Sequence, residues 1–203
     1  ELKSGKRDIE LIDEVIYERQ ENVKRRKAIF GTIKDVFFYM TLFIVVPVFI
    51  FSLISRFTNN AIMIGDRTVM VVASGSMSYK AETNEYLVTN NLNDQFSKYD
   101  IIILEKVDNA SELKQFDTIA FVNDKGVNII HRIKSFKSDG KMETRGDAVE
   151  TSDPYNPVFS DVIGRYTGKK INSIGMFVMF FQSYAGIITI VSLVYCLLMI
   201  DKL

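Results

Sequence analysis

Twenty consecutive residues without a charged side chain, from Val36 to Ser55, constrain this chain more than any other feature of its sequence. A helix rises about 1.5 Å per residue, so a run of this length covers the ~30 Å hydrocarbon core of a bilayer. We therefore predict a transmembrane helix over 36–55. A second uncharged run, from Ile171 to Ile200, contains glycines and polar residues. We divide it into an interfacial segment over 173–183 and a second transmembrane helix over 184–200.

Lysine and arginine residues predict how these helices are oriented. Six of them lie between residues 19 and 34, before the first span, whereas only Arg56 and Arg67 lie in the 20 residues after it. Because basic residues favour the cytoplasmic side, we expect a cytoplasmic charged helix over 1–35 and a cytoplasmic tail over 201–203. Residues 56–172 are then extracytoplasmic. The expected location is the cell membrane, or the endoplasmic reticulum membrane in a eukaryote, as a multi-pass protein in contact with lipid.

The region between the two apolar runs is predicted to be rich in β-strands. Short β-branched or aromatic runs are separated there by polar clusters, and they occupy 68–72, 86–89, 101–104, 118–122 and 128–130. Asp124-Lys125-Gly126 predicts a hairpin turn. The expected fold class is therefore mainly β: an extracytoplasmic antiparallel catalytic domain flanked by two transmembrane helices.

The composition excludes some classes of function. The chain has 25 basic and 25 acidic residues, and this balance argues against a nucleic-acid binder, which needs a basic surface. A single cysteine and a single histidine cannot supply the usual four ligands of a zinc site. We therefore expect no metal.

Three polar sites in the β-rich region together suggest chemistry. Ser74-Gly75-Ser76-Met77 follows the first predicted strand, His131 is the only histidine, and Asp147 and Asp153 lie in a loop containing glycine and proline. Taken singly, each has an ordinary structural explanation: a turn serine, a strand histidine and turn-forming acids. Together they supply the nucleophile, base and orienting carboxylate that activate a weak hydroxyl nucleophile near neutral pH.

At these residues the chain resembles the signal peptidase I family, in the Ser/His branch typical of the endoplasmic reticulum, archaea and some Gram-positive bacteria. The Ser-Gly-Ser-Met box stands at 74–77, the base and its following arginine at His131-Arg132, and the acid box at Gly146-Asp147 with Asp153 six residues on. The run 161–166 resembles the strand that follows, so the resemblance covers roughly residues 36–200.

Three positions depart from the family's usual pattern. The family commonly has proline where this chain has Tyr79, and glycine where this chain has Tyr99 and Phe116, before Asp100 and Asp117. These differences concern the shape of loops and substrate preference. They leave the catalytic groups unchanged.

The resemblance implies a membrane-bound serine endopeptidase that removes N-terminal signal peptides from exported preproteins. Ser76 would attack the peptide carbonyl, with His131 as base and then acid. The resemblance assigns Asp153 to orient His131 and Asp147 to hold the loop or strengthen the network, although the two acids could exchange roles. The Ser76 N–H and the Ser74 hydroxyl would form the oxyanion hole. The resemblance also implies that no organic cofactor is needed. The implied partners are signal peptides with small residues at positions −1 and −3, bound along an exposed β-edge, and contact with the secretion machinery is compatible with this role.

Two other functions fit parts of the sequence. A catalytically silent membrane-anchored assembly or binding factor could share the fold, but it would not need to keep Ser76, His131 and Asp153 together. A signalling receptor would need a cytoplasmic output domain, and residues 1–35 do not resemble one.

Overall fold

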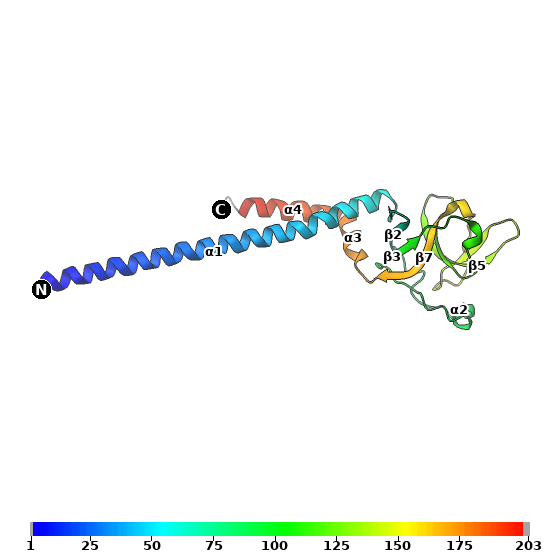
Figure 1. The fold of residues 1–203 in the computed structure, drawn as a ribbon, viewed down its shortest axis with the longest axis horizontal. Helices are drawn as coiled ribbons and strands as arrows, with labels where there is room; N and C mark the ends of the chain where they lie inside the picture. Colours follow the sequence, from blue (N-terminus) through cyan, green and yellow to red (C-terminus); the bar gives the residue numbers. More distant parts are fainter. Residues whose placement is uncertain (1, 201–203) are drawn as a thin grey trace. The chain divides into compact units, whose positions relative to one another are not determined.

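The computed structural model describes the backbone of residues 2–200 and the side chains of residues 12–196 and 199; the predicted tail, 201–203, lies outside the described residues. The chain begins with α1, one continuous helix from Leu2 to Phe57 that contains both the charged segment and the first apolar run (Figure 1). Its stretch Ile12–Phe57 is long and apolar enough to cross a membrane. Residues 48–199 form one compact unit, and α1 up to Pro47 belongs to a separate unit.

The second unit is built on a seven-stranded antiparallel sheet. Its strands are β1 (Ala61–Ile64), β2 (Arg67–Val71), β3 (Ile101–Glu105), β4 (Thr118–Val122), β5 (Asn128–Phe136), β6 (Met142–Arg145) and β7 (Val162–Ile171). The strand order is β1-β2-β3-β7-β4-β5-β6, so the last strand lies between β3 and β4 (Figure 1). All neighbouring strands are antiparallel, and this part of the predicted fold is confirmed.

The core lies on both faces of the sheet. Alternate residues of a strand point to opposite faces, so Ala120 joins one apolar cluster while Ile119 and Phe121 join the other. The first cluster also contains Met70, Val72, Met77, Phe96, Ile102, Leu104 and Tyr166, and the second contains Leu113, Ile133 and Met142. Burial on two sides explains why β4 is continuously apolar from Ile119 to Val122 rather than alternating.

One predicted strand is wrong. Residues 86–89 lie in the short helix α2, Glu85–Thr89, instead of a strand. Leu87 is fully buried while Val88 is exposed, and the buried Asn84 amide before the helix donates to backbone carbonyls of the loop that follows β6. Strand propensity spans only about 1 kcal/mol, which burial and hydrogen bonding of this kind outweigh.

Four of the predicted strands and the hairpin turn are confirmed, but two strands were not predicted. The hairpin turn at 124–126 joins β4 to β5 as predicted, and the runs at 68–72, 101–104, 118–122 and 128–130 correspond to β2 to β5. Strands β1 and β6 had not been predicted. Both are four residues long, and their sequences, AIMI and METR, lack the alternation of polar and apolar residues that marks a strand.

Two of the positions that depart from the family's usual glycine, Tyr99 and Phe116, lie in equivalent turns. Tyr99 and Phe116 both have a φ of 75°, in the left-handed region where glycine is favoured. Asp100 and Asp117 follow them, and each carboxylate accepts the backbone N–H three residues earlier, at 2.9 Å. The chain therefore keeps a turn that suits glycine while placing an aromatic residue there, at a backbone cost of about 1–2 kcal/mol per position.

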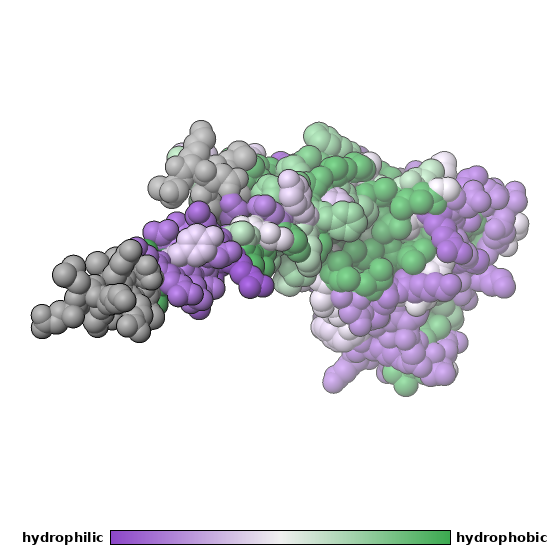
Figure 2. All heavy atoms as spheres, turned by 60° about the vertical axis from the view of Figure 1, so that its left-hand side comes forward, coloured by the Kyte–Doolittle hydropathy of each residue, from purple (hydrophilic) through white to green (hydrophobic). Residues whose placement is uncertain are grey.

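Two helices follow the sheet. In α3 (Gly175–Gln182), Val178 is buried and the Gly175 N–H donates to the Tyr99 carbonyl at 2.9 Å, where an added Cβ would lie 2.6 Å from that oxygen. A bend of 85° separates α3 from α4 (Tyr184–Ile200), and the Ser183 hydroxyl accepts the Gly186 N–H at the start of α4. Such a bent pair fits a broken span or a re-entrant loop. Hydrophobic residues gather together on the face seen in Figure 2, rather than being scattered among hydrophilic ones.

Candidate active site

Ser76 lies in a tight turn that follows β2. The backbone N–H and the hydroxyl of Ser78 both donate to the Gly75 carbonyl, at 3.1 Å and 2.6 Å. The Ala148 N–H donates to the Ser76 carbonyl at 2.8 Å, which ties this turn to the loop after β6. The neighbouring Met77 is 1% exposed and anchors the turn in the core. The Ser76 backbone is thus held on both sides while its side chain remains accessible.

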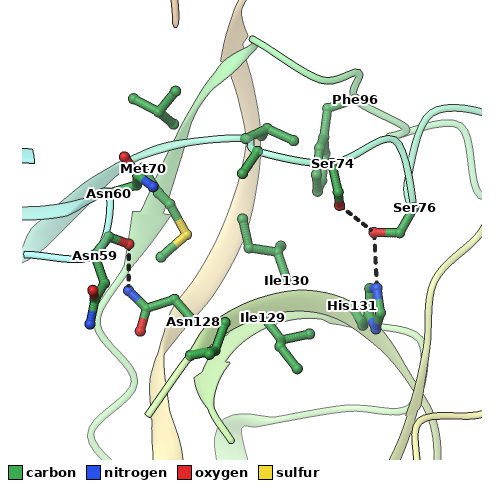
Figure 3. Close-up of a pocket in the computed structure, with 14 residues that line it drawn as sticks. Asn59, Asn60, Met70, Ser74, Ser76, Phe96, Asn128, Ile129, Ile130 and His131 are labelled. Carbon is green, nitrogen blue, oxygen red and sulfur yellow. Dashed lines mark hydrogen bonds between the residues drawn. The ribbon is translucent and has the colours of Figure 1, made fainter. Parts of the chain in front are cut away.

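His131 lies on β5 opposite the buried Ile119 of β4, and this pairing fixes its backbone position. Its Nε2 lies 2.9 Å from the Ser76 Oγ, and its side chain is 12% exposed (Figure 3). The Ser74 Oγ lies 3.2 Å from the Ser76 Oγ, on the other side of the nucleophile from the imidazole. The Ser76 hydroxyl therefore has an imidazole nitrogen and a second hydroxyl within hydrogen-bonding distance.

Asp153 completes a three-residue relay. Its Oδ2 lies 2.7 Å from the Nδ1 of His131, and its side chain is also 12% exposed. An ionised carboxylate can only accept hydrogen bonds. With Asp153 ionised, Nδ1 of His131 carries the ring proton and Nε2 is left to accept the proton of Ser76. This is the tautomer that a general base needs.

Asp147 does not contact His131. Its fully buried carboxylate accepts hydrogen bonds from Arg132 at 2.8 Å and 2.7 Å, and from Gln95 at 2.8 Å. Arg132 also donates to Asp94 at 2.6 Å. Burial alone would lower the pKa of Arg132, but the hydrogen bonds to Asp147 and Asp94 outweigh it, so its pKa is raised. The two acids in the loop thus differ: Asp153 faces the imidazole, and Asp147 belongs to a buried ion pair.

Gly146 permits the close approach of the loop to the nucleophile and the base. A Cβ at this position would lie 2.7 Å from the Ser76 carbonyl oxygen and 3.0 Å from Nε2 of His131. Real Cβ atoms do not come that close to a backbone oxygen, so any side chain would displace the turn, the loop or the ring. Glycine is required here for space rather than for an unusual backbone angle.

For the cleavage reaction that the sequence resemblance implies, we expect Gly146→Ala to lower kcat by about 100-fold, because a displacement of about 1 Å between reacting groups costs that much. Gly140→Ala is the matched control: that glycine lies in the β5–β6 turn with nothing within 4 Å of an added Cβ, although its φ of +81° adds strain. Cleavage rates and melting temperatures of both variants would be measured. Full activity of Gly146→Ala would show that the loop tolerates the displacement.

A cavity of about 370 Å³ runs along the sheet beside Ser76 and His131. Met70, Phe96 and Ile130 contribute apolar walls, and at the end away from the relay the Asn128 side chain donates to the Asn59 carbonyl at 2.9 Å (Figure 3).

Two backbone segments border this cavity. The pairing of β2 with β1 ends at Met70, and the pairing of β5 with β6 begins at Arg132. Residues 73–74, which follow β2, and residues 128–131 of β5 therefore line the cavity without being paired to β1 or β6.

Sequence reasoning missed several members of the site. From the sequence, Arg132 was identified only as the residue that follows His131. Nothing in the sequence pointed to a role for Gln95 or Thr144, because single polar residues near loops are common. Only the approach of three separate chain segments in space shows that they contact the two acids.

A scan against known protein-family models and a search of curated proteins give no match to this chain.

Proposed function

We propose that this chain is a membrane-anchored serine endopeptidase that removes N-terminal signal peptides from exported preproteins. One observation carries the proposal: the hydrogen-bonded relay from Ser76 through His131 to Asp153, beside a cavity with apolar walls. A serine hydroxyl is a weak nucleophile, and this arrangement supplies what activates it.

The proposed reaction has two halves. The Ser76 Oγ attacks the scissile carbonyl carbon while His131 accepts its proton, and the Ser74 hydroxyl with the Ser76 N–H stabilises the developing oxyanion. His131 then protonates the leaving amine, which leaves an acyl-enzyme. In the second half a water molecule, deprotonated by His131, releases the signal peptide and restores the serine. Asp153 stabilises the imidazolium that forms in both halves.

The cavity supports an extended peptide as substrate. A peptide strand can pair with the backbone of residues 73–74 and 128–131, and its alternate side chains then enter the cavity. The volume of about 370 Å³ lies at the lower end of ligand-site volumes, and walls such as Phe96 leave room for small apolar side chains. This agrees with alanine at positions −1 and −3 of the cleavage site.

We also propose that α1 is the first transmembrane helix, with its N-terminal end in the cytoplasm, and that α3 lies at the outer interface while α4 forms a second span. The basic residues between positions 19 and 34 support this orientation. In α3, Met176 and Phe177 are exposed while Val178 is buried against the sheet, as expected for a helix with lipid on one side. The β-domain is then extracytoplasmic, where exported preproteins emerge.

This topology predicts a labelling pattern in cells. In a Cys196→Ser background, a cysteine replacing the exposed Lys125 in the β4–β5 turn should react with a membrane-impermeant maleimide, and one replacing Gln20 should not. Both should react after the membrane is permeabilised, which controls for accessibility. The reverse pattern would place the catalytic domain in the cytoplasm and contradict the proposed function.

The function itself is tested by incubating the full chain, purified in detergent micelles, with a preprotein that has alanine at −1 and −3. We expect one cut, located by mass spectrometry of both products. The same preprotein with phenylalanine at −1 should remain intact. Equal cleavage of both would indicate an unspecific protease, and cleavage of neither would favour the silent binding factor.

A further inference from the structure

Thr144 contacts the acid of the relay from behind. It lies on β6 opposite Ile133 and is fully buried. Its hydroxyl donates to Oδ2 of Asp153 at 2.6 Å, and its backbone carbonyl accepts the Asp153 N–H at 2.8 Å. One strand residue therefore holds both the backbone and the carboxylate of Asp153.

The oxygen that Thr144 contacts is the one that faces the base. Oδ2 of Asp153 accepts from the Thr144 hydroxyl and from Nδ1 of His131, at 2.6 Å and 2.7 Å. A carboxylate can rotate about its last bond, and this torsion is soft. Two donors converging on one oxygen select the rotamer in which that oxygen points at the imidazole. Threonine suits this task because its branched side chain restricts χ1.

Glu143 and Ser152, the residues before Thr144 and Asp153, are also hydrogen-bonded to each other through their side chains. Glu143 accepts the Ser152 hydroxyl at 2.5 Å and the Ser135 hydroxyl at 2.9 Å. The hydrogen bond from Ser152 contributes most, and that from Ser135 next, to lowering the pKa of Glu143 to about 2. Glu143 therefore stays ionised in any assay near neutral pH. Residues 143 and 144 thus bind residues 152 and 153, and the end of the loop has one register.

We propose that Thr144 is a positioning residue for the Ser76–His131–Asp153 relay: its buried hydroxyl holds the Asp153 carboxylate in the orientation that His131 needs. As a statement about catalysis, this inference rests on the proposed function. As a statement about the imidazole, it can be tested without any substrate.

The test uses the fact that His131 is the only histidine of the chain. Selective ¹⁵N-histidine labelling of the full protein in detergent micelles gives imidazole signals from this residue alone, and their titration with pH is followed by NMR. Thr144→Val keeps the shape and removes the donor, and Thr144→Ser keeps the donor. If the valine variant does not fold, Thr144→Ala removes the same donor with a smaller side chain.

We expect the titration midpoint of Thr144→Val to move to lower pH than that of the parent, because a carboxylate that has turned away from His131 no longer stabilises the imidazolium. Thr144→Ser should stay close to the parent. A midpoint moved to higher pH would mean that the carboxylate, with one donor fewer, still faces the imidazole without Thr144, and it would overturn the positioning role. An unchanged midpoint overturns the proposal, whatever happens to the rate.

Glu143→Gln is the matched control, because it alters the contact with Ser152 without touching Asp153. Its His131 midpoint should equal that of the parent. If the His131 midpoint of Glu143→Gln moved as far as that of Thr144→Val, any loosening of the loop would move the midpoint. A specific positioning role of Thr144 would then be contradicted.

Kinetics in the cleavage assay complete the test. Thr144→Val should lower kcat about tenfold, well short of the ~10⁴-fold loss typical of removing the carboxylate itself, with KM changed less than twofold. Thr144→Ser should regain most of the rate. If the parent chain cleaves no preprotein, the proposed function fails, while the NMR midpoints still decide whether Thr144 positions the relay.

Discussion

Ser76→Ala should reduce preprotein cleavage to below about 10⁻⁴ of the parent rate, because no other group in the relay can form the acyl-enzyme. The fold should survive the change. The hydrogen-bond partners of the Ser76 hydroxyl are the Ser74 hydroxyl and the His131 ring, and none of these contacts belongs to the core. The purified variant should therefore keep the melting temperature of the parent.

Ser78→Ala is the matched control for this result. Its hydroxyl donates to the Gly75 carbonyl at 2.6 Å in the same turn, so the variant loses a structural hydrogen bond rather than the nucleophile. We expect it to retain most of the activity, since the Ser78 N–H donates to the same carbonyl. A Ser76→Ala enzyme that still cleaves at more than a few per cent of the parent rate would remove Ser76 from the mechanism.

The parts of the fold that could be predicted from sequence are those in which local pattern and burial agree. The strand β4 is apolar on both faces, and the turn after it contains Asp124-Lys125-Gly126, so strand and hairpin were both predictable. Residues 86–89 have the same kind of composition but form α2, because the buried Asn84 and Leu87 hold the segment against the loop after β6. A contact between segments about 60 residues apart leaves no trace in a local pattern.

The candidate site shows the same division. Ser76, His131 and an acid in the following loop were proposed from their residue types, the family resemblance selected Asp153 as the orienting acid, and the structure brings these three residues together. The sequence could not predict that Asp147 forms a buried ion pair with Arg132 instead of contacting His131, since both acids lie in one loop six residues apart. Their difference arises from what lies behind each of them: Arg132 behind Asp147 and Thr144 behind Asp153. Such partners come from other strands, so only the folded chain reveals them.

That difference predicts opposite phenotypes for two chemically identical substitutions. Asp153→Asn should lower kcat by up to about 10⁴-fold, because an amide at this position can donate to Nδ1 of His131 and so favours the tautomer that cannot accept the Ser76 proton. The neutral amide also fails to stabilise the imidazolium. Stability should change little, because the Thr144 hydroxyl can accept a hydrogen bond from the same amide nitrogen, which takes the place of Oδ2.

Asp147→Asn should instead act on stability. It leaves the guanidinium of Arg132, which is 1% exposed, with Asp94 as its remaining carboxylate, and breaking a buried pair in this way costs about 3–5 kcal/mol. The melting temperature should fall markedly. The folded fraction should keep a kcat within about tenfold of the parent, because Asp147 lies outside the relay.

Asp94→Asn separates these two effects. It removes the other carboxylate from the same guanidinium, but Asp94 is 36% exposed, so solvent can replace part of the interaction. Its melting temperature should lie between those of the parent and Asp147→Asn, with kcat unchanged. Thermal unfolding followed by tyrosine fluorescence, and kcat corrected for the folded fraction, distinguish the three variants. If Asp147→Asn and Asp153→Asn lose equal amounts of kcat with both proteins folded, the two acids act as one network through His131-Arg132, and a single orienting carboxylate is the wrong description.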